Sequence, residues 1–335
     1  MKKRIIFFFL LLVVGIVFFI VTVNQTGIDE IWANLRQFKL LHFGIFLGLS
    51  TLNFMLYTLR WHLILNRINK KKVGFFRLFM HRMSGFAVSY ITPTAQTGGE
   101  PLRALLLHED GVSSKTSASS VIIDKGLEFA ALFLFIGAGL GLALLEGSLD
   151  PNMQKVFMGL LLVLLVLIFW FYFSSVKNIG FFSSILRFFR LTKFRRVKSV
   201  EEKIMEIEDE MSHFYKKHMP TFVVLVLISL VIASFLLLEH WLIARFMGVN
   251  MTFLQTFLVS TIPYLAFMIP IPGGLGVLEG GHAAIFAALG ISINAFVLVF
   301  IIRIRDLVFV LIGLIHASKQ AVQMLKKAFF EKNNV

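Results

Sequence analysis

Long apolar runs separated by short polar stretches dominate this chain. Six runs have the length, or nearly the length, of about 20 residues that a helix needs to cross a bilayer. They are 5–23, 40–58, 126–145, 156–173, 221–244 and 294–316. The pattern therefore predicts an all-α polytopic membrane protein with about six full transmembrane helices. A hydrophobic fraction of 57% agrees with this class and excludes an ordinary soluble domain.

Proline and glycine interrupt two further apolar segments. The breaks contain Pro93, Gly98 and Gly99 in the first segment, and Pro270, Pro272, Gly273, Gly274 and Gly276 in the second. Broken backbone is tolerated at membrane depth only where it is buried in protein or lines a wet cavity. We therefore expect two re-entrant helical hairpins, each followed by an acidic residue, Glu100 or Glu279.

The distribution of basic residues predicts the orientation of the chain. Ten Lys and Arg lie between Lys177 and Lys217, and five between Arg60 and Lys72. Basic loops of membrane proteins stay in the cytoplasm. We expect a multi-pass protein of the cell (plasma) membrane, with its N-terminus and C-terminus cytoplasmic. The first hairpin then enters from the cytoplasm and the second from outside, so their topology is inverted.

A weak internal likeness supports an inverted repeat. At an offset of 179 residues (272 − 93), 5 of 21 ungapped positions are identical, including Pro93 with Pro272 and Glu100 with Glu279. Inverted repeats around a midplane site are a transporter design. Chance likeness between two stretches rich in Gly and Ala is the other interpretation. We interpret 1–335 as a single transmembrane domain, with repeats at about 40–145 and about 221–316.

The segment 177–218 is the one substantial polar region. Its apolar residues recur at helical spacing, which predicts a basic amphipathic connector on the cytoplasmic face. Charge confined to such segments argues against nucleic acid as a partner. No GxxxxGK[ST] or HExxH motif and no cysteine occurs, so we expect no ATPase activity, no metal site and no cofactor.

Charged residues within apolar surroundings are the candidate substrate-binding or transport residues. They are Glu100, Arg103, Asp124, Lys125, Glu128, Glu279, Arg303, Arg305 and Asp306. Arginine at the centre of a membrane helix costs at least ~2.5–3.5 kcal/mol, so we expect Arg303 or Arg305 to pair with Glu279. Glu100 and Arg103 share a helix face, and they either bind a headgroup or proton or form a salt bridge that closes the hairpin.

Two other charged stretches have simpler interpretations. Arg60-Trp61-His62 is interpreted as a snorkelling cation beside interfacial aromatic residues. Glu239-His240, late in its apolar run, is placed near the outer interface.

The motifs together resemble the lysylphosphatidylglycerol synthase transmembrane-region family. They are Arg60-Trp61, Pro93…Gly98-Gly99-Glu100-Pro101-Leu102-Arg103, Asp124-Lys125…Glu128 and Pro272-Gly273-Gly274-Leu275-Gly276-Val277…Glu279. The family includes the flippase half of the bacterial multiple peptide resistance factor. The resemblance implies a stand-alone member without the aminoacyl-transferase domain, and hence no synthesis of lysyl-lipid. Asp124-Lys125 departs from the Glu-Arg often found in the family, and Leu278 from a basic residue.

We therefore expect a lipid transporter of flippase type, which moves a phospholipid, aminoacyl-lipid or glycolipid through a cavity between the two broken hairpins. The alternatives are an integral-membrane enzyme acting on a lipid headgroup and a non-transporting scaffold for a lipid-modifying enzyme. Membrane lipids are the expected partners. A second copy of the chain, as a homodimer, and a lipid-modifying enzyme are further partners that the sequence leaves open.

The predicted topology can be tested by labelling, because the chain has no cysteine of its own. Single cysteines introduced at Ser113 and Ser148 should react with an impermeant reagent from opposite sides of the membrane. Reaction of both from the outside would refute the cytoplasmic origin of the first hairpin.

Overall fold

The computed structural model describes residues 36, 38–94, 96–146, 151–188, 195–291 and 295–333. Within these ranges every regular element is a helix, which confirms the all-α class. Among the described residues, four helices are long and apolar enough to cross a membrane: α3 (Leu40–Ile68), α6 (Ser114–Leu145), α7 (Pro151–Lys177) and α10 (Met219–Phe246). They correspond to four of the six predicted runs.

The two remaining runs have different outcomes. The run 294–316 is contained, from Ala295 on, in α13 (Ala295–Asn333), whose middle carries charged residues. The run 5–23 lies outside the described residues, as does the labelling position Ser148.

The chain forms two compact units, each assembled from segments that are distant in sequence. Unit 1 comprises Met1–Leu52, Gly74–Leu107 and Leu238–Val335, and unit 2 comprises Asn53–Val73 and His108–Leu237. Helices α3 and α10 pass from one unit into the other, so each contributes one end to either core. The inverted repeat and its boundaries stay predictions.

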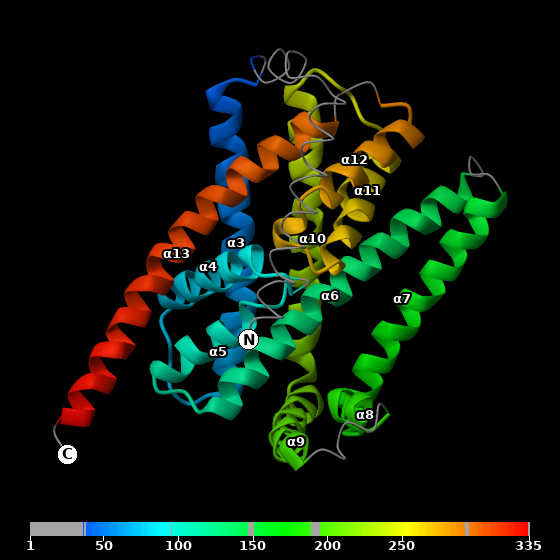
Figure 1. The fold of residues 1–335 in the computed structure, drawn as a ribbon. Coiled ribbons are helices and arrows are strands. Elements are labelled where there is room, and N and C mark those ends of the chain that lie inside the picture. Colours follow the sequence, from blue (N-terminus) through cyan, green and yellow to red (C-terminus); the bar gives the residue numbers. More distant parts are fainter. Residues whose placement is uncertain are drawn as a thin grey trace. The chain divides into compact units, whose positions relative to one another are not determined.

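Unit 1 holds both broken segments. Its other elements are α4 (Phe75–Ile91), α5 (Glu100–Glu109, up to Leu107), α11 (Phe253–Thr261), η2 (Ile262–Met268), η3 (Pro272–Gly274) and α12 (Val277–Ala288). Helices α4 and α13 lie side by side (Figure 1). Phe46, Val259 and Leu278 are among the side chains of its apolar core. The core thus joins α3 to the second broken segment.

The first break owes its shape to a close approach of backbone. Helix α4 ends where Thr92 turns to extended backbone, and the Gly99 N–H donates to Ser89 Oγ at 2.9 Å. A Cβ on Gly99 would collide with the Gly85 carbonyl of α4. Only glycine therefore allows the chain to return against α4 before α5 begins.

The second break depends on left-handed backbone. Gly273, Gly274 and Gly276 have φ values of 59°, 60° and 77°, which other residues adopt at a cost. Both clusters of proline and glycine therefore lie outside the α-helices of the described residues. The re-entrant placement of the two hairpins in a bilayer stays a prediction.

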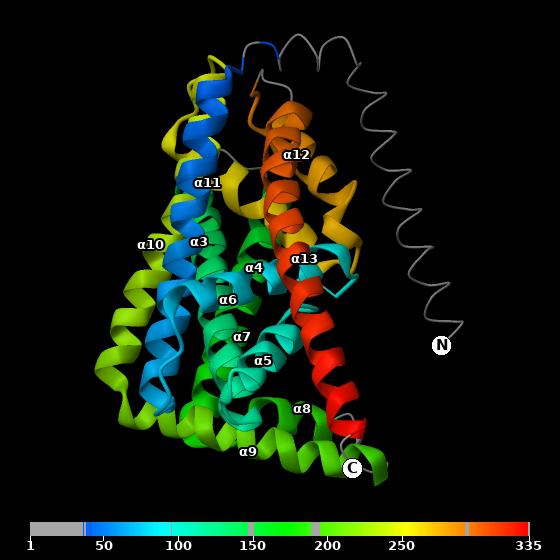
Figure 2. The same ribbon diagram turned by 90° about the vertical axis from the view of Figure 1, so that its left-hand side faces the viewer.

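Unit 2 packs α6 and α7 against the polar connector. The connector forms α8 (Phe181–Phe188) and α9 (Arg195–Lys217), and α9 runs crosswise to α6 and α7 (Figure 2). Met211 and Phe214 of α9 are buried with Ile123 and Leu127 of α6. The apolar side chains of α9 thus pack on α6, and the role of the segment as a cytoplasmic connector stays a prediction.

We expect alanine to separate the roles of two helical glycines in unit 1. A Cβ on Gly313 of α13 would collide with the Met83 backbone of α4. At Gly48 of α3, no atom of the described residues outside the surrounding turns of α3 lies within 4 Å of the added Cβ. Gly48→Ala should stabilise the protein by up to about 1 kcal/mol through helix propensity. Gly313→Ala should lower the midpoint of thermal unfolding in detergent. Equal midpoints for the two variants would refute the close packing of α4 on α13.

Candidate functional site

Arg303 is the centre of a buried polar cluster in unit 1. Its side chain is 8% exposed, and its Nε donates to Oε1 of Glu279, which is 1% exposed. Its Nη1 donates to Tyr90 Oη and to the Gly273 carbonyl, each at 2.9 Å. Its Nη2 donates to the Gly274 carbonyl at 3.3 Å. Of the two partners expected for Glu279, the structure selects Arg303.

The glycines of the second break place the acceptors of Arg303. Their positive φ values turn two successive carbonyls, of Gly273 and Gly274, toward one guanidinium. A Cβ on Gly273 would lie 3.0 Å from the Tyr90 ring, so this backbone packs directly on α4. The unusual backbone and the buried cation therefore depend on each other.

The carboxylate of the first break lies beside the same helix. Ser89 Oγ donates to Glu100 Oε2 at 3.3 Å, and Tyr90, the next residue of α4, binds Arg303. Glu100 is 18% exposed at its side chain and lies 3.8 Å from Nη1 of Arg103. Consecutive residues of α4 thus connect the two glutamates that the sequence aligned.

Arg305 forms a second buried cluster in unit 1. Its Nη1 donates to Glu239 Oε2 at 2.9 Å and to Ser50 Oγ at 3.0 Å. Its Nε lies 2.9 Å from Oδ1 of Asp306. The sequence pattern assigned no partner to Glu239, yet the structure buries it, 2% exposed, against a cation from α13.

Unit 2 contains an ion pair that the sequence analysis missed. Arg60 Nε lies 2.8 Å from Asp124 Oδ1, its Nη2 donates to the Asp124 carbonyl, and its Nη1 donates to Ser229 Oγ. Arg60 and Trp61 are both 0% exposed, and Trp61 donates to Ser120 Oγ at 3.1 Å. The interfacial snorkelling interpretation of Arg60 and Trp61 is therefore wrong. An arginine just after an apolar run, together with an aspartate that had no assigned partner, was the signal for this pair.

The other charged residues of α6 extend this pair. Lys125 Nζ lies 2.7 Å from Glu128 Oε1 and 5.0 Å from the centre of the Phe129 ring. Glu128 Oε2 lies 3.7 Å from Arg60 Nη2. The nine predicted residues therefore divide into two sets. Asp124, Lys125 and Glu128 belong to unit 2, and Glu100, Arg103, Glu279, Arg303, Arg305 and Asp306 to unit 1.

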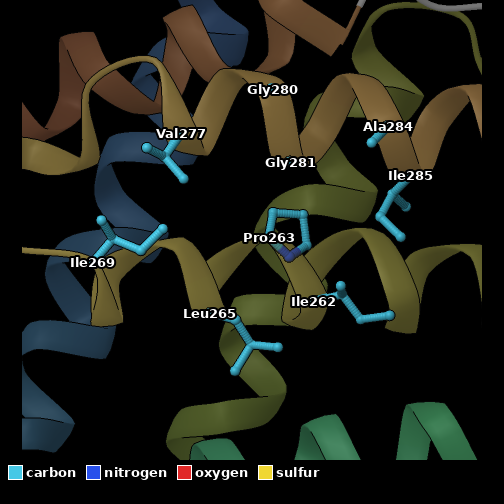
Figure 3. A pocket seen from close by; sticks show the side chains of 9 residues that line it. All are labelled: Ile262, Pro263, Leu265, Ile269, Val277, Gly280, Gly281, Ala284 and Ile285. Carbon is cyan, nitrogen blue, oxygen red and sulfur yellow. The ribbon is translucent and has the colours of Figure 1, made fainter. Parts of the chain in front are cut away.

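An apolar pocket lies on another face of α12 (Figure 3). It has a volume of about 560 Å³, and its walls include Ile262, Pro263 and Ile269 on one side and Val277 and Ile285 on the other. Gly280 and Gly281 form its floor on α12, next to Glu279 in sequence. One short helix thus carries a buried carboxylate and an apolar recess that would suit hydrocarbon.

Comparison with known proteins identifies the family of the chain. The sequence profile of the family described as "Lysylphosphatidylglycerol synthase TM region" matches residues 6–313. The chain belongs to this family.

Members of the family in archaea resemble the chain over most of its length. A "UPF0104 membrane protein" of Methanothermobacter thermautotrophicus is 27% identical over 287 residues, which cover 83% of this chain and 84% of the relative. A protein of the same description from Pyrococcus horikoshii is 24% identical over 295 residues, covering 83% and 86%. One from Archaeoglobus fulgidus is 24% identical over 277 residues, covering 80% and 82%. No solved structure matches the chain.

Removing either residue of the Arg60–Asp124 pair should destabilise this protein more than a substitution at an exposed position does. A buried charge without its partner costs about 3–5 kcal/mol. Arg60→Ala and Asp124→Ala should each lower the thermal midpoint strongly, and Arg60→Met with Asp124→Leu should recover part of the loss. Lys115→Ala is the control, since it lies at an exposed position of α6. A midpoint for Arg60→Ala equal to that of Lys115→Ala would show that the pair carries no such cost.

Proposed function

We propose that this protein moves a polar-headgroup lipid between the leaflets of a membrane, as a transporter of flippase type. Its substrate is a phospholipid, an aminoacyl-lipid or a glycolipid. It works in the cell membrane, with both termini in the cytoplasm. The family and the long apolar helices support a membrane location.

The observation that carries the proposal is the buried pair of Glu279 and Arg303 at broken backbone. A headgroup crosses hydrocarbon only if protein groups replace its water, which requires charges inside the membrane and backbone carbonyls that no helix uses. The second break supplies both, because two carbonyls, a tyrosine hydroxyl and a carboxylate converge on one guanidinium.

The same groups suggest how a headgroup is held. A lipid phosphate is a bidentate acceptor for a guanidinium, so it competes with Glu279 for Arg303. Glu279, once released, is free to accept from an ammonium or hydroxyl group of the headgroup. Exchange of one ion pair for another keeps the buried charge compensated at each stage.

The apolar pocket on α12 supports an amphipathic substrate. It lies one residue along the helix from Glu279, and aliphatic side chains and glycine form its walls. An acyl chain placed there would leave its headgroup near the second break. This arrangement favours a lipid over a free polar solute.

A lipid-movement assay tests the proposal directly. Purified protein is reconstituted with a trace of headgroup-labelled lipid, and an impermeant quencher measures how fast the inner-leaflet label reaches the outer leaflet. We expect Glu279→Gln and Arg303→Lys to slow this movement about 10-fold or more, because charge-assisted hydrogen bonds contribute about 1.5–3 kcal/mol. Glu146→Gln, an exposed position at the end of α6, should move lipid like the wild type.

Thermal unfolding of each variant separates folding from function. Arg303 keeps the Tyr90 hydroxyl and two carbonyls in Glu279→Gln, so we expect that variant to remain folded. A folded Glu279→Gln protein that moves lipid at the wild-type rate would show that the carboxylate is structural. A wild type that moves none of the three lipid classes would overturn the proposed function.

A further inference from the structure

We propose that Glu239 and Asp306 share one proton at Arg305, and that binding and release of this proton are coupled to lipid movement. The coupling part of this inference rests on the proposed function. The proton is taken from water and converts one carboxylate to a carboxylic acid, with no other reactant.

The count of charges around Arg305 carries the inference. Arg305 lies between two carboxylates, with Nη1 2.9 Å from Glu239 and Nε 2.9 Å from Asp306. The three side chains are 11%, 3% and 9% exposed. One cation therefore faces two anions. A buried carboxylate without its own counterion costs far more free energy than a neutral carboxylic acid in the same place. One bound proton restores neutrality.

The neighbouring cation does not cancel the surplus. Arg303 also attracts Asp306 electrostatically, but it already has Glu279 as its own counterion. The two clusters on α13 together contain two guanidinium groups, of Arg303 and Arg305, and three carboxylates, of Glu239, Glu279 and Asp306. A single proton balances this set.

The hydrogen bonds of Glu239 identify where the proton can bind. Its Oε2 accepts from Arg305, whereas its Oε1 is buried and has no hydrogen-bond partner among the described residues. Oε2 of Glu279 is buried in the same way, but Glu279 has Arg303 as its own counterion, whereas Glu239 shares Arg305 with Asp306. An anionic oxygen without a donor is among the most unfavourable groups in a protein interior, and protonation removes its charge. The hydroxyl of Ser50, from α3, accepts from Arg305 Nη1 and also interacts with the Glu239 carboxylate.

Two histidines and a tyrosine complete the titratable surroundings. The ring centres of His240 and Tyr264 are 5.8 Å apart, and Tyr264 also interacts electrostatically with Arg305. His240 and His282 stack at 5.7 Å, and His282 Nδ1 bonds the Leu278 carbonyl. Both rings are 0% exposed, so a proton on either would create a new buried charge, whereas a proton on a carboxylate removes one.

The position of the cluster explains how a proton would influence the lipid. Arg303 and Arg305 lie two residues apart on α13, and the Asp306 carboxylate attracts both guanidinium groups electrostatically. When Glu239 and Asp306 are both ionised, their surplus charge competes with an anionic headgroup for Arg303. Protonation removes that competition, so proton binding and headgroup binding at Arg303 favour each other.

Infrared spectroscopy tests the proton site without any lipid. The purified protein should show the C=O stretch of a protonated carboxylic acid at neutral pH, shifted on exchange into heavy water. Glu239→Gln and Asp306→Asn should each remove this band, and Glu146→Gln should retain it. Absence of the band in wild type, or its persistence in both variants, would overturn the inference. The inference would also be overturned if His240→Gln were the only variant to lose the band. Should the carboxylate variants fail to fold, titration of the band in wild type still decides whether a buried acid exists.

Lipid movement under an imposed pH gradient tests the coupling. Allosteric coupling free energies correspond to about fivefold changes or more, so a gradient should change the wild-type rate by that factor. Glu239→Gln should move lipid at a rate that no longer depends on the gradient. Equal wild-type rates with and without the gradient would refute coupling and leave the proposed function standing. No lipid movement at all would refute both, while the infrared band would still decide the proton site.

Discussion

A charge inside an apolar fold must be compensated by another part of the chain, and this constraint organises both units. Arg60 and Arg303 are each buried with a carboxylate from a distant segment, Asp124 or Glu279. Because an unpaired guanidinium in such surroundings costs several kcal/mol, each pair fixes the register of the helices that carry it. The apolar faces then pack around a framework whose alignment the ion pairs set.

Glycine makes the second of these pairs sterically feasible. Gly273 and Gly274 turn their carbonyls to Arg303 through left-handed backbone, and Gly313 brings α13 against α4. A side chain at any of these positions would separate groups that must lie within hydrogen-bond distance. Close backbone packing and charge compensation are thus two aspects of one arrangement in unit 1.

The same arrangement gives the proposed transporter its working parts. A guanidinium held by several weak acceptors, rather than by one carboxylate alone, can exchange a partner without being left unpaired. The neighbouring cluster at Arg305 has one acid too many, which makes it sensitive to protons. A lipid site and a proton site on one helix would give the family member both a substrate and a source of directional control.

The sequence by itself determined what depends on local pattern. Runs of about 20 apolar residues require helices wherever the chain lacks water to satisfy its backbone, so four described helices and the all-α class followed directly. Clusters of proline and glycine disfavour a continuous helix, and in the described residues no α-helix continues through either cluster. The charge-carrying positions were also visible, because arginine and aspartate are rare in apolar runs.

Only the tertiary structure decided which charges meet. Ion pairs such as Arg60–Asp124 and Arg305–Glu239 join residues 64 and 66 positions apart, and no local pattern encodes such a distance. Arg60 was misread because a cation at the end of an apolar run looks the same whether it reaches water or a buried aspartate. Tyr90 was missed because a phenol on a helix has no signature until a cation packs against it. A charge needs a counterion only once packing has removed it from water. The packed helices therefore decide which partner each charge has.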